Sequence, residues 1–198
     1  MSPWNKDRTI GQKRPLQISH IWGIRIRLEL EGKTRDLALF NMALDSELRG
    51  CYLVKLKVSD IAYGSSVSSR ATVLQQKTGS PVQFELTKGT REAVAALIKL
   101  GNLYSKNYLF QSRVSNCQHI STRQYKRIFH GWIAKIGLED SLYSTHSMRR
   151  TKPYLIYKKT KNLRVIQLLL GHKKLESTVR YLGIEVDDAL EISESIEV

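Results

Sequence analysis

The sequence is short of cysteine, of long apolar runs and of clustered acidic side chains. Its 198 residues include two cysteines, Cys51 and Cys117, which are too few for a disulfide framework or a metal knuckle. No run approaches the roughly 18–20 apolar residues of a membrane span, and no apolar signal core follows Met1. No carboxylates have the spacing of metal ligands. We therefore expect a cytoplasmic protein with no membrane partner, no metal and no organic cofactor.

Acidic residues are scarce and unevenly placed. Lysine and arginine number 32 against 18 aspartates and glutamates, a net charge of +14. Six of the acids lie in the segment 185–198, which has no lysine or arginine, so residues 1–184 carry 32 bases against 12 acids, a charge of +20. Such a basic body predicts a polyanionic partner, most simply nucleic acid. The apolar content of 41% is typical of a folded globular domain.

The apolar spacing predicts a mainly helical chain with a small antiparallel sheet, an α+β arrangement. Helices are expected over residues 18–31, 35–48, 91–100, 121–136, 145–159, 163–170 and 175–182. Strands are expected over residues 53–61, 71–75 and 82–86. A parallel α/β sheet is disfavoured because the strands cluster instead of alternating with helices.

The chain divides into a basic N-terminal arm (1–16), a central domain (17–184) and an acidic tail (185–198). Val186, Ala189, Ile192 and Ile196 have roughly helical spacing, so we expect the tail to form an amphipathic helix. This helix either stays solvated or docks on a basic body, its own or that of a neighbouring copy.

Three local groups could bind an anion. Arg49 follows an apolar helix, where a guanidinium needs a partner or a ligand, and taken alone it is better explained by a structural ion pair. Lys77 lies in the turn between two expected strands, where a lysine is usually only solvated. His146 and Arg149 are three residues apart and share one helix face. They could cradle a phosphate, or could belong to a basic surface helix.

A fourth group closes the pattern near the C-terminus. An apolar helix ends at Gly171, His172 follows, and Tyr181 lies nine residues further on. Taken alone, Tyr181 is explained as a core or interface aromatic residue.

In this order, the four groups resemble the tyrosine recombinase (phage integrase) family. The resemblance extends from about Trp22 to Ala189, and its most specific block runs from His146 to Tyr181. The motif LRGCYLVKLKVSDI around Arg49 is similar to the first box of the family, and LLLGH followed by STVRY is similar to the last. The resemblance implies the DNA breaking-rejoining catalytic fold and the catalytic set Arg49, Lys77, His146, Arg149, His172 and Tyr181.

The resemblance implies a role for each residue of this set. Tyr181 would attack a DNA phosphodiester, form a 3′-phosphotyrosine and release a 5′-hydroxyl. Arg49 and Arg149 would hold the two non-bridging oxygens, whose negative charge grows in the transition state.

The remaining three residues would assist the phosphoryl transfer. Lys77 would protonate the departing 5′-oxygen. His146 would help to move the proton of the nucleophile, and His172 would donate a hydrogen bond to the phosphoryl group. Together these groups remove the need for a metal ion.

Further implications concern partners and origin. The family acts on double-stranded DNA as a homo-oligomer, a tetramer on paired sites whose protomers exchange C-terminal segments, and an accessory DNA-bending protein would fit beside it. The resemblance also implies that the protein is encoded by a bacterium, phage or plasmid, on a mobile element, and that it acts at the nucleoid.

Two features depart from the family pattern. Tyr52 stands three residues after Arg49, where the family usually has an aspartate or glutamate that supports the site. The family usually also has an N-terminal core-binding domain, whereas here only the basic arm precedes the catalytic part. The chain thus resembles a stand-alone catalytic domain, which would grip DNA from fewer sides, use a helper protein, or be a piece of a longer protein.

Two other functions are compatible with the sequence. The first is a non-catalytic DNA-binding regulator, in which residues 163–170 and 174–181 form a helix-turn-helix. Such a regulator would not require the set Arg49, Lys77, His146, Arg149 and His172. The second is a type IB-like topoisomerase, which shares the chemistry; the small size and the acidic tail favour the site-specific recombinase.

Overall fold

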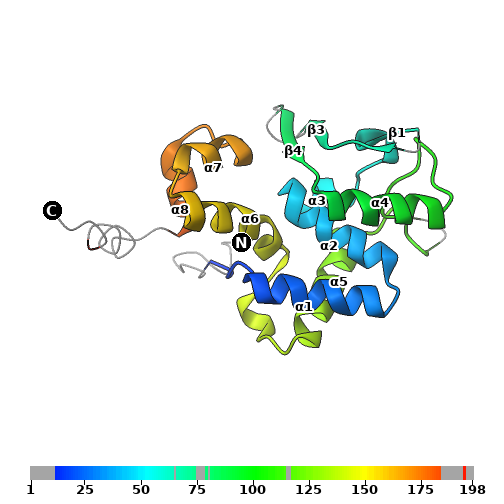
Figure 1. Cartoon of the computed structure of the whole chain (residues 1–198), viewed down its shortest axis with the longest axis horizontal. Coiled ribbons are helices and arrows are strands. Elements are labelled where there is room, and N and C mark those ends of the chain that lie inside the picture. Colours follow the sequence, from blue (N-terminus) through cyan, green and yellow to red (C-terminus); the bar gives the residue numbers. More distant parts are fainter. Residues whose placement is uncertain are drawn as a thin grey trace, which may run out of the picture.

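The computed structural model describes residues 12–64, 66–74, 79, 81–114, 117–183 and 194. Within these ranges the chain is mainly helical with two small antiparallel sheets, which confirms the fold class expected from the sequence (Figure 1). The helices are α1 (Ile18–Leu30), α2 (Thr34–Ser46), α3 (Gly50–Leu53), α4 (Lys88–Leu100), α5 (Thr122–Lys135), α6 (Thr145–Thr160), α7 (Leu163–Leu170) and α8 (Leu175–Leu182). The strands are β1 (Ala62–Tyr63), β2 (Ser66–Val67), β3 (Arg70–Leu74) and β4 (Pro81–Glu85), and two 3-10 helices are η1 (Val58–Asp60) and η2 (Asp140–Leu142).

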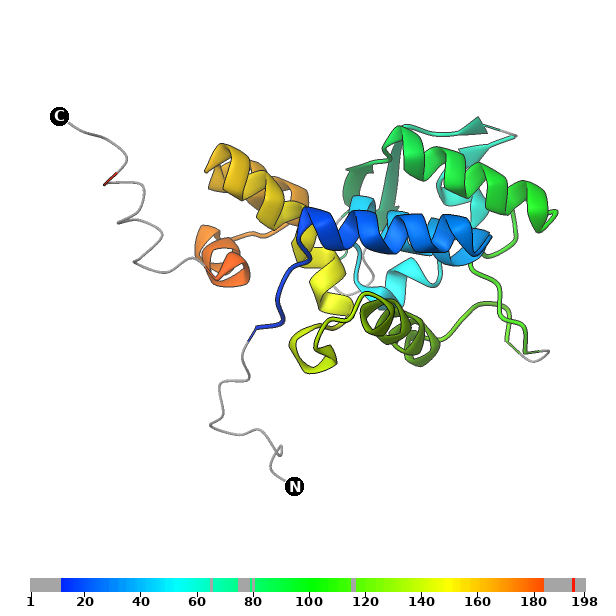
Figure 2. The same cartoon turned by 60° about the horizontal axis from the view of Figure 1, so that its bottom comes forward.

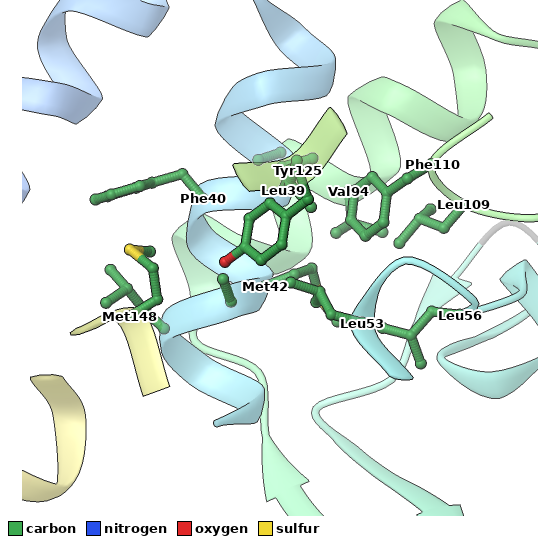
Figure 3. Close-up of a cluster of buried hydrophobic side chains, with 14 of the residues drawn as sticks. Leu39, Phe40, Met42, Leu53, Leu56, Val94, Leu109, Phe110, Tyr125 and Met148 are labelled. Atoms are coloured by element: carbon green, nitrogen blue, oxygen red, sulfur yellow. The ribbon is translucent and has the colours of Figure 1, made fainter. Parts of the chain in front are cut away.

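Helix α2 lies at the centre of the fold. It packs against α1, α4, α6 and β4, and every residue from Ala38 to Ser46 is buried. A helix surrounded in this way needs no polar face. Figure 3 shows Phe40 and Met42 of α2 within a cluster that also contains Tyr125 of α5. The core built around α2 extends to side chains of β3 and β4 and so joins the helices to the strands.

Strands β3 and β4 form an antiparallel pair in which Arg70 lies opposite Glu85. Val82 and Phe84 of β4 are buried and their neighbours are exposed, as expected for a sheet with one face on the core. The acidic tail expected over residues 185–198 lies, apart from Glu194, outside the described residues.

The strand expected over residues 53–61 is wrong. This segment forms the end of α3 and the 3-10 helix η1 instead. Leu53, Leu56, Val58 and Ile61 are all buried, a spacing that a turn of helix satisfies better than strict alternation does. The backbone N–H of Lys57 donates to a carboxylate oxygen of Asp60 at 2.8 Å and stabilises this turn.

Helices α6, α7 and α8 form the C-terminal end of the described molecule, beside α1 to α5 (Figures 1 and 2). Leu170 and Leu182 belong to an apolar cluster of their own. Gly171 ends α7 and Gly183 ends α8, both with positive φ, 66° and 68°, where a side chain would be strained. Among the described helices, none is both long enough and apolar enough to cross a membrane.

Candidate active site

Five of the six expected catalytic residues lie in the described part of the chain, and four of them line one groove. Arg49, Arg149, His172 and Tyr181 line a groove of about 870 Å³. His146 lies on α6, one turn before Arg149, and burial together with the charges of Arg149 and Arg49 lowers its pKa. The sixth residue, Lys77, lies outside the described residues. The groove is also lined by Gln12, Lys174, Glu176, Ser177 and Arg180.

Arg149 is held in place by a backbone contact. It is 8% exposed, and its Nε donates to the carbonyl oxygen of Glu47 at 2.7 Å. This bond occupies Nε and leaves the two terminal nitrogens for an anion in the groove. Because Glu47 is two residues before Arg49, the same short segment after α2 positions both arginines.

Tyr181 lies among cationic and aromatic groups. Its ring centroid is 5.4 Å from Cζ of Arg149 and 5.8 Å from Cζ of Arg150. The rings of His172 and Tyr181 pack edge to face, with their centroids 5.5 Å apart. The hydroxyl oxygen is buried and has no hydrogen-bond partner among the described residues. Burial raises the pKa of Tyr181 to about 12, against the opposing charge of Arg149. The hydroxyl is therefore protonated at neutral pH, and among the described residues it lacks the polar partner that buried groups normally have.

His172 is positioned by the end of α7. Gly171 adopts the left-handed conformation, and the following backbone N–H of His172 donates to the carbonyl oxygen of Gln167 at 3.0 Å. The His172 ring shares a hydrogen bond between Nδ1 and the buried hydroxyl of Thr178 at 3.1 Å. Nε2 is thus the nitrogen left for a ligand. Burial and the charges of Arg149 and Arg49 lower the pKa of His172, so its ring is neutral near pH 7.

A buried carboxylate fixes the helices behind the groove. Asp45, at the end of α2, accepts hydrogen bonds from the backbone N–H of Thr87 at 2.8 Å and the hydroxyl of Thr90 at 2.6 Å. Its other oxygen accepts from Nζ of Lys152 in α6 at 3.0 Å. One aspartate therefore joins α2, α4 and α6, the helices that carry or flank the arginines.

Two groups at the site were missed by the sequence reasoning. Glu47 is 7% exposed, has a φ of 53° and leaves one carboxylate oxygen without a partner among the described residues. Burial raises its pKa to about 8, although Lys152 and Arg149 oppose the shift. Arg150 is 9% exposed and contacts the ring of Tyr181. The signals available in the sequence were an acid two residues before Arg49 and a second arginine beside Arg149, and neither indicates burial.

Chemically, the groove suits an anion flanked by donors. Two guanidinium groups and a neutral imidazole line the groove together with the side chain of Tyr181, the set needed to hold a phosphate and attack it. Within the described ranges, no three histidine, cysteine, aspartate or glutamate side chains are arranged to hold a metal ion.

Comparison with known sequences gives consistent matches. The model of the Phage integrase family matches residues 24–186. The probable integrase/recombinase YoeC of Bacillus subtilis strain 168 is 30% identical over 165 residues, covering 80% of this chain and 82% of that protein. The tyrosine recombinase XerC of Chlamydia trachomatis serovar L2 is 26% identical over 189 residues, covering 87% of this chain and 54% of XerC. The chain thus spans about half the length of that second relative.

Solved structures show the same fold. The crystal structure of XerA recombinase superposes with a TM-score of 0.74 and 20% identity, covering 94% of this chain and 66% of that chain. The crystal structure of a lambda integrase dimer bound to a COC′ core site gives a TM-score of 0.67 and 19% identity, covering 92% of this chain and 50% of that chain. The matched family model covers most of the chain and includes every groove residue from Arg49 to Tyr181. The chain therefore belongs to the phage integrase family of tyrosine-type site-specific recombinases.

Proposed function

We propose that residues 17–184 form a catalytic domain that cleaves and rejoins double-stranded DNA through Tyr181. The observation that carries this proposal is the groove, where the buried hydroxyl of Tyr181 has no hydrogen-bond partner within the described ranges and its ring lies beside Arg149 and His172. A scissile phosphate in this groove would bind the guanidinium groups of Arg49 and Arg149 and would be the reaction partner of the Tyr181 hydroxyl.

The reaction is a transesterification, in which one phosphorus–oxygen bond forms as another breaks. The oxygen of Tyr181 attacks phosphorus, the bond from phosphorus to the 5′-oxygen breaks, and a 3′-phosphotyrosine and a free 5′-hydroxyl result. His146, neutral near pH 7 because burial and the two arginines lower its pKa, takes up the tyrosine proton. Lys77 returns a proton to the departing 5′-oxygen. Because the phosphotyrosine linkage retains the energy of the broken phosphodiester bond, the reverse attack by a 5′-hydroxyl rejoins DNA without ATP.

The two arginines and His172 stabilise the transition state. Arg149 is fixed through Nε, so its terminal nitrogens can bind one non-bridging oxygen, and Arg49 from the segment before α3 binds the other. His172, with Nδ1 engaged by Thr178, donates from Nε2 to the phosphoryl group. Preorganised donors of this kind contribute several kcal/mol, because their orientation is set before the charge develops.

Assembly on DNA extends the proposal. The basic body would bind phosphates, and protomers would form a tetramer on paired sites by exchanging the acidic tails of residues 185–198. An apolar groove of about 570 Å³ between β4 and α7, lined by Val82, Val165 and Leu168 among others, offers a surface for the apolar residues of a neighbour's tail. Deleting residues 185–198 should weaken higher-order assembly on DNA in native gels; unchanged assembly would refute the exchange.

The decisive experiment uses nicked DNA carrying a candidate site. The nick lets the short strand downstream of the scissile phosphate diffuse away after cleavage, so the covalent adduct accumulates and survives denaturation. Tyr181→Phe should abolish the adduct, whereas Tyr63→Phe, which alters an exposed tyrosine on β1, should leave it unchanged. Tight binding to a verified site without an adduct would favour the DNA-binding regulator. Relaxation of supercoiled DNA without site preference would favour the topoisomerase.

A further inference from the structure

The segment before α1 lies across the two helices that carry the groove. Gln12 donates from its side chain to the carbonyl oxygen of Arg180 in α8. The backbone N–H of Leu16 donates to the hydroxyl of Thr151 in α6 at 2.9 Å, and Leu16 is 1% exposed. Figure 2 shows this segment leading into α1 past α6 and α8. Residues 12–16 are thus packed against the C-terminal half of the chain.

Arg150 connects this segment to the end of the nucleophile helix. Its Nη1 donates to the carbonyl oxygen of Lys13 at 2.6 Å, and its Nη2 donates to the carbonyl oxygen of Leu182 at 3.4 Å. Its Cζ lies 5.8 Å from the ring centroid of Tyr181. A single guanidinium group therefore contacts the N-terminal segment, the last turn of α8 and the nucleophile.

The environment of Arg150 is costly for a cation. The residue is 9% exposed, and no acidic side chain within the described ranges forms an ion pair with it. Two carbonyl oxygens solvate the guanidinium but do not neutralise its charge. The group nearby that gains negative charge is Tyr181, when its hydroxyl loses the proton and attacks. The burial of Arg150 is therefore better explained by the reaction than by folding alone.

We propose that Arg150 is a positioning residue for Tyr181, which fastens the end of α8 to residues 12–16 and keeps a positive charge over the ring of the nucleophile. This inference rests on the proposed function. The charge of Arg150 opposes the rise that burial causes in the pKa of Tyr181. The other charged or titratable groups that face Tyr181 are Arg149, Arg49, Glu47 and His172.

Two substitutions separate the positive charge from the bridge. Arg150→Lys retains the charge, but an ammonium group lacks the planar fork that reaches two carbonyl oxygens. Arg150→Met retains much of the apolar volume and loses both. Arg127→Met removes one positive charge from the exposed face of α5 and serves as the matched control.

The first measurement is single-turnover cleavage of nicked DNA as a function of pH. Arg150→Met should lower the cleavage rate at least about tenfold, because a charge that stabilises the developing phenolate is lost. Its rate should continue to rise with pH beyond the point where the wild-type rate levels off, and Arg150→Lys should partly restore the wild-type profile. DNA affinity should stay within about threefold of wild type, a change below 1 kcal/mol.

A modified substrate locates the defect on the nucleophile side. When the leaving 5′-oxygen is replaced by sulfur, the thiolate leaves without a proton donor. The defect of Arg150→Met should persist on this substrate, whereas that of Lys77→Ala should be relieved. Rescue of Arg150→Met by the sulfur substrate, or a wild-type pH profile with a proportional loss of DNA affinity, would overturn the inference.

Hydrogen exchange tests the bridge without DNA. In the free protein, Arg150→Met should speed amide exchange both in residues 12–16 and in the last turn of α8, and Arg127→Met should change neither. Unchanged exchange in both segments would refute the bridge. If wild type forms no adduct on any site, the proposed function fails, and the exchange result still decides whether Arg150 joins the two segments.

Discussion

Replacing Glu47 by glutamine tests the electrostatics behind the groove. The carboxyl group of Glu47 is buried at the end of α2, one oxygen has no partner among the described residues, and burial raises its pKa to about 8. Glutamine has nearly the same shape and no ionisable proton. The substitution therefore removes the cost of ionising this buried group and leaves the packing unchanged.

The expected magnitude follows from proton linkage. Below the ordinary glutamate pKa of 4.5, the carboxyl group is protonated in both the folded and the unfolded chain, and it contributes no pH dependence. Between 4.5 and about 8 the unfolded chain loses this proton and the folded chain keeps it, so the wild-type free energy of unfolding falls by about 1.4 kcal/mol per pH unit from this group. Relative to wild type, Glu47→Gln should thus gain stability with rising pH, up to about 5 kcal/mol near pH 8.

The assay is urea denaturation followed by tryptophan fluorescence, at intervals from about pH 5 to about pH 8. Glu92→Gln, on the exposed face of α4, is the matched control and should remain parallel to wild type throughout. Adduct formation at neutral pH should be retained in Glu47→Gln, because the wild-type carboxyl group is already protonated there. A constant stability difference between Glu47→Gln and wild type across this range would refute a raised pKa at Glu47.

Three further predictions concern the groove and its support. Asp45→Asn should lower the free energy of unfolding by about 2–3 kcal/mol in urea titrations, since the charge-assisted bonds to α4 and to Lys152 are weakened. Gly171→Ala should cost about 1–2 kcal/mol by calorimetry, because its φ of 66° strains an L-residue, and should reduce the cleavage rate by displacing His172. The cleavage rate should fall in acid only below the ordinary histidine pKa of 6.5, because burial and the arginines lower the pKa of His146; a midpoint above 6.5 in a pH–rate profile would contradict this.

Most of the helices could be predicted from the sequence. Helices α7 and α8 match the expected residues 163–170 and 175–182, because apolar spacing defines each helix and a glycine marks where it ends. The segment 53–61 resembles a strand in sequence because its five apolar residues in nine alternate in part with polar ones, and only their burial shows the turn. Whether such a run forms a turn or a strand depends on the segment that packs against it. Here Lys57 forms a single antiparallel β-bridge with Tyr108, and no longer ladder follows within the described residues.

The site divides in the same way. The order and spacing of the motifs singled out Arg49, Arg149, His172 and Tyr181, which the structure brings to one groove. Glu47 and Arg150 could not be singled out, because their importance depends on burial by distant segments. Arg150 bonds to Lys13, 137 residues away in the chain, and no local pattern indicates which of two adjacent arginines faces such a partner.

The contact between Gln12 and α8 places the start of the segment before α1 next to the end of α8. The side chain of Gln12 bonds to the carbonyl of Arg180, and its Oε1 is 3.3 Å from the position that a Cβ on Gly183 would occupy. In a chain trimmed to residues 12–183, this proximity would permit circular permutation, because a short linker could join the two residues and new ends could be opened in an exposed loop such as that at Asn102. A permuted chain would deliver the nucleophile from the middle of the polypeptide and would show whether the groove needs the natural order of its segments.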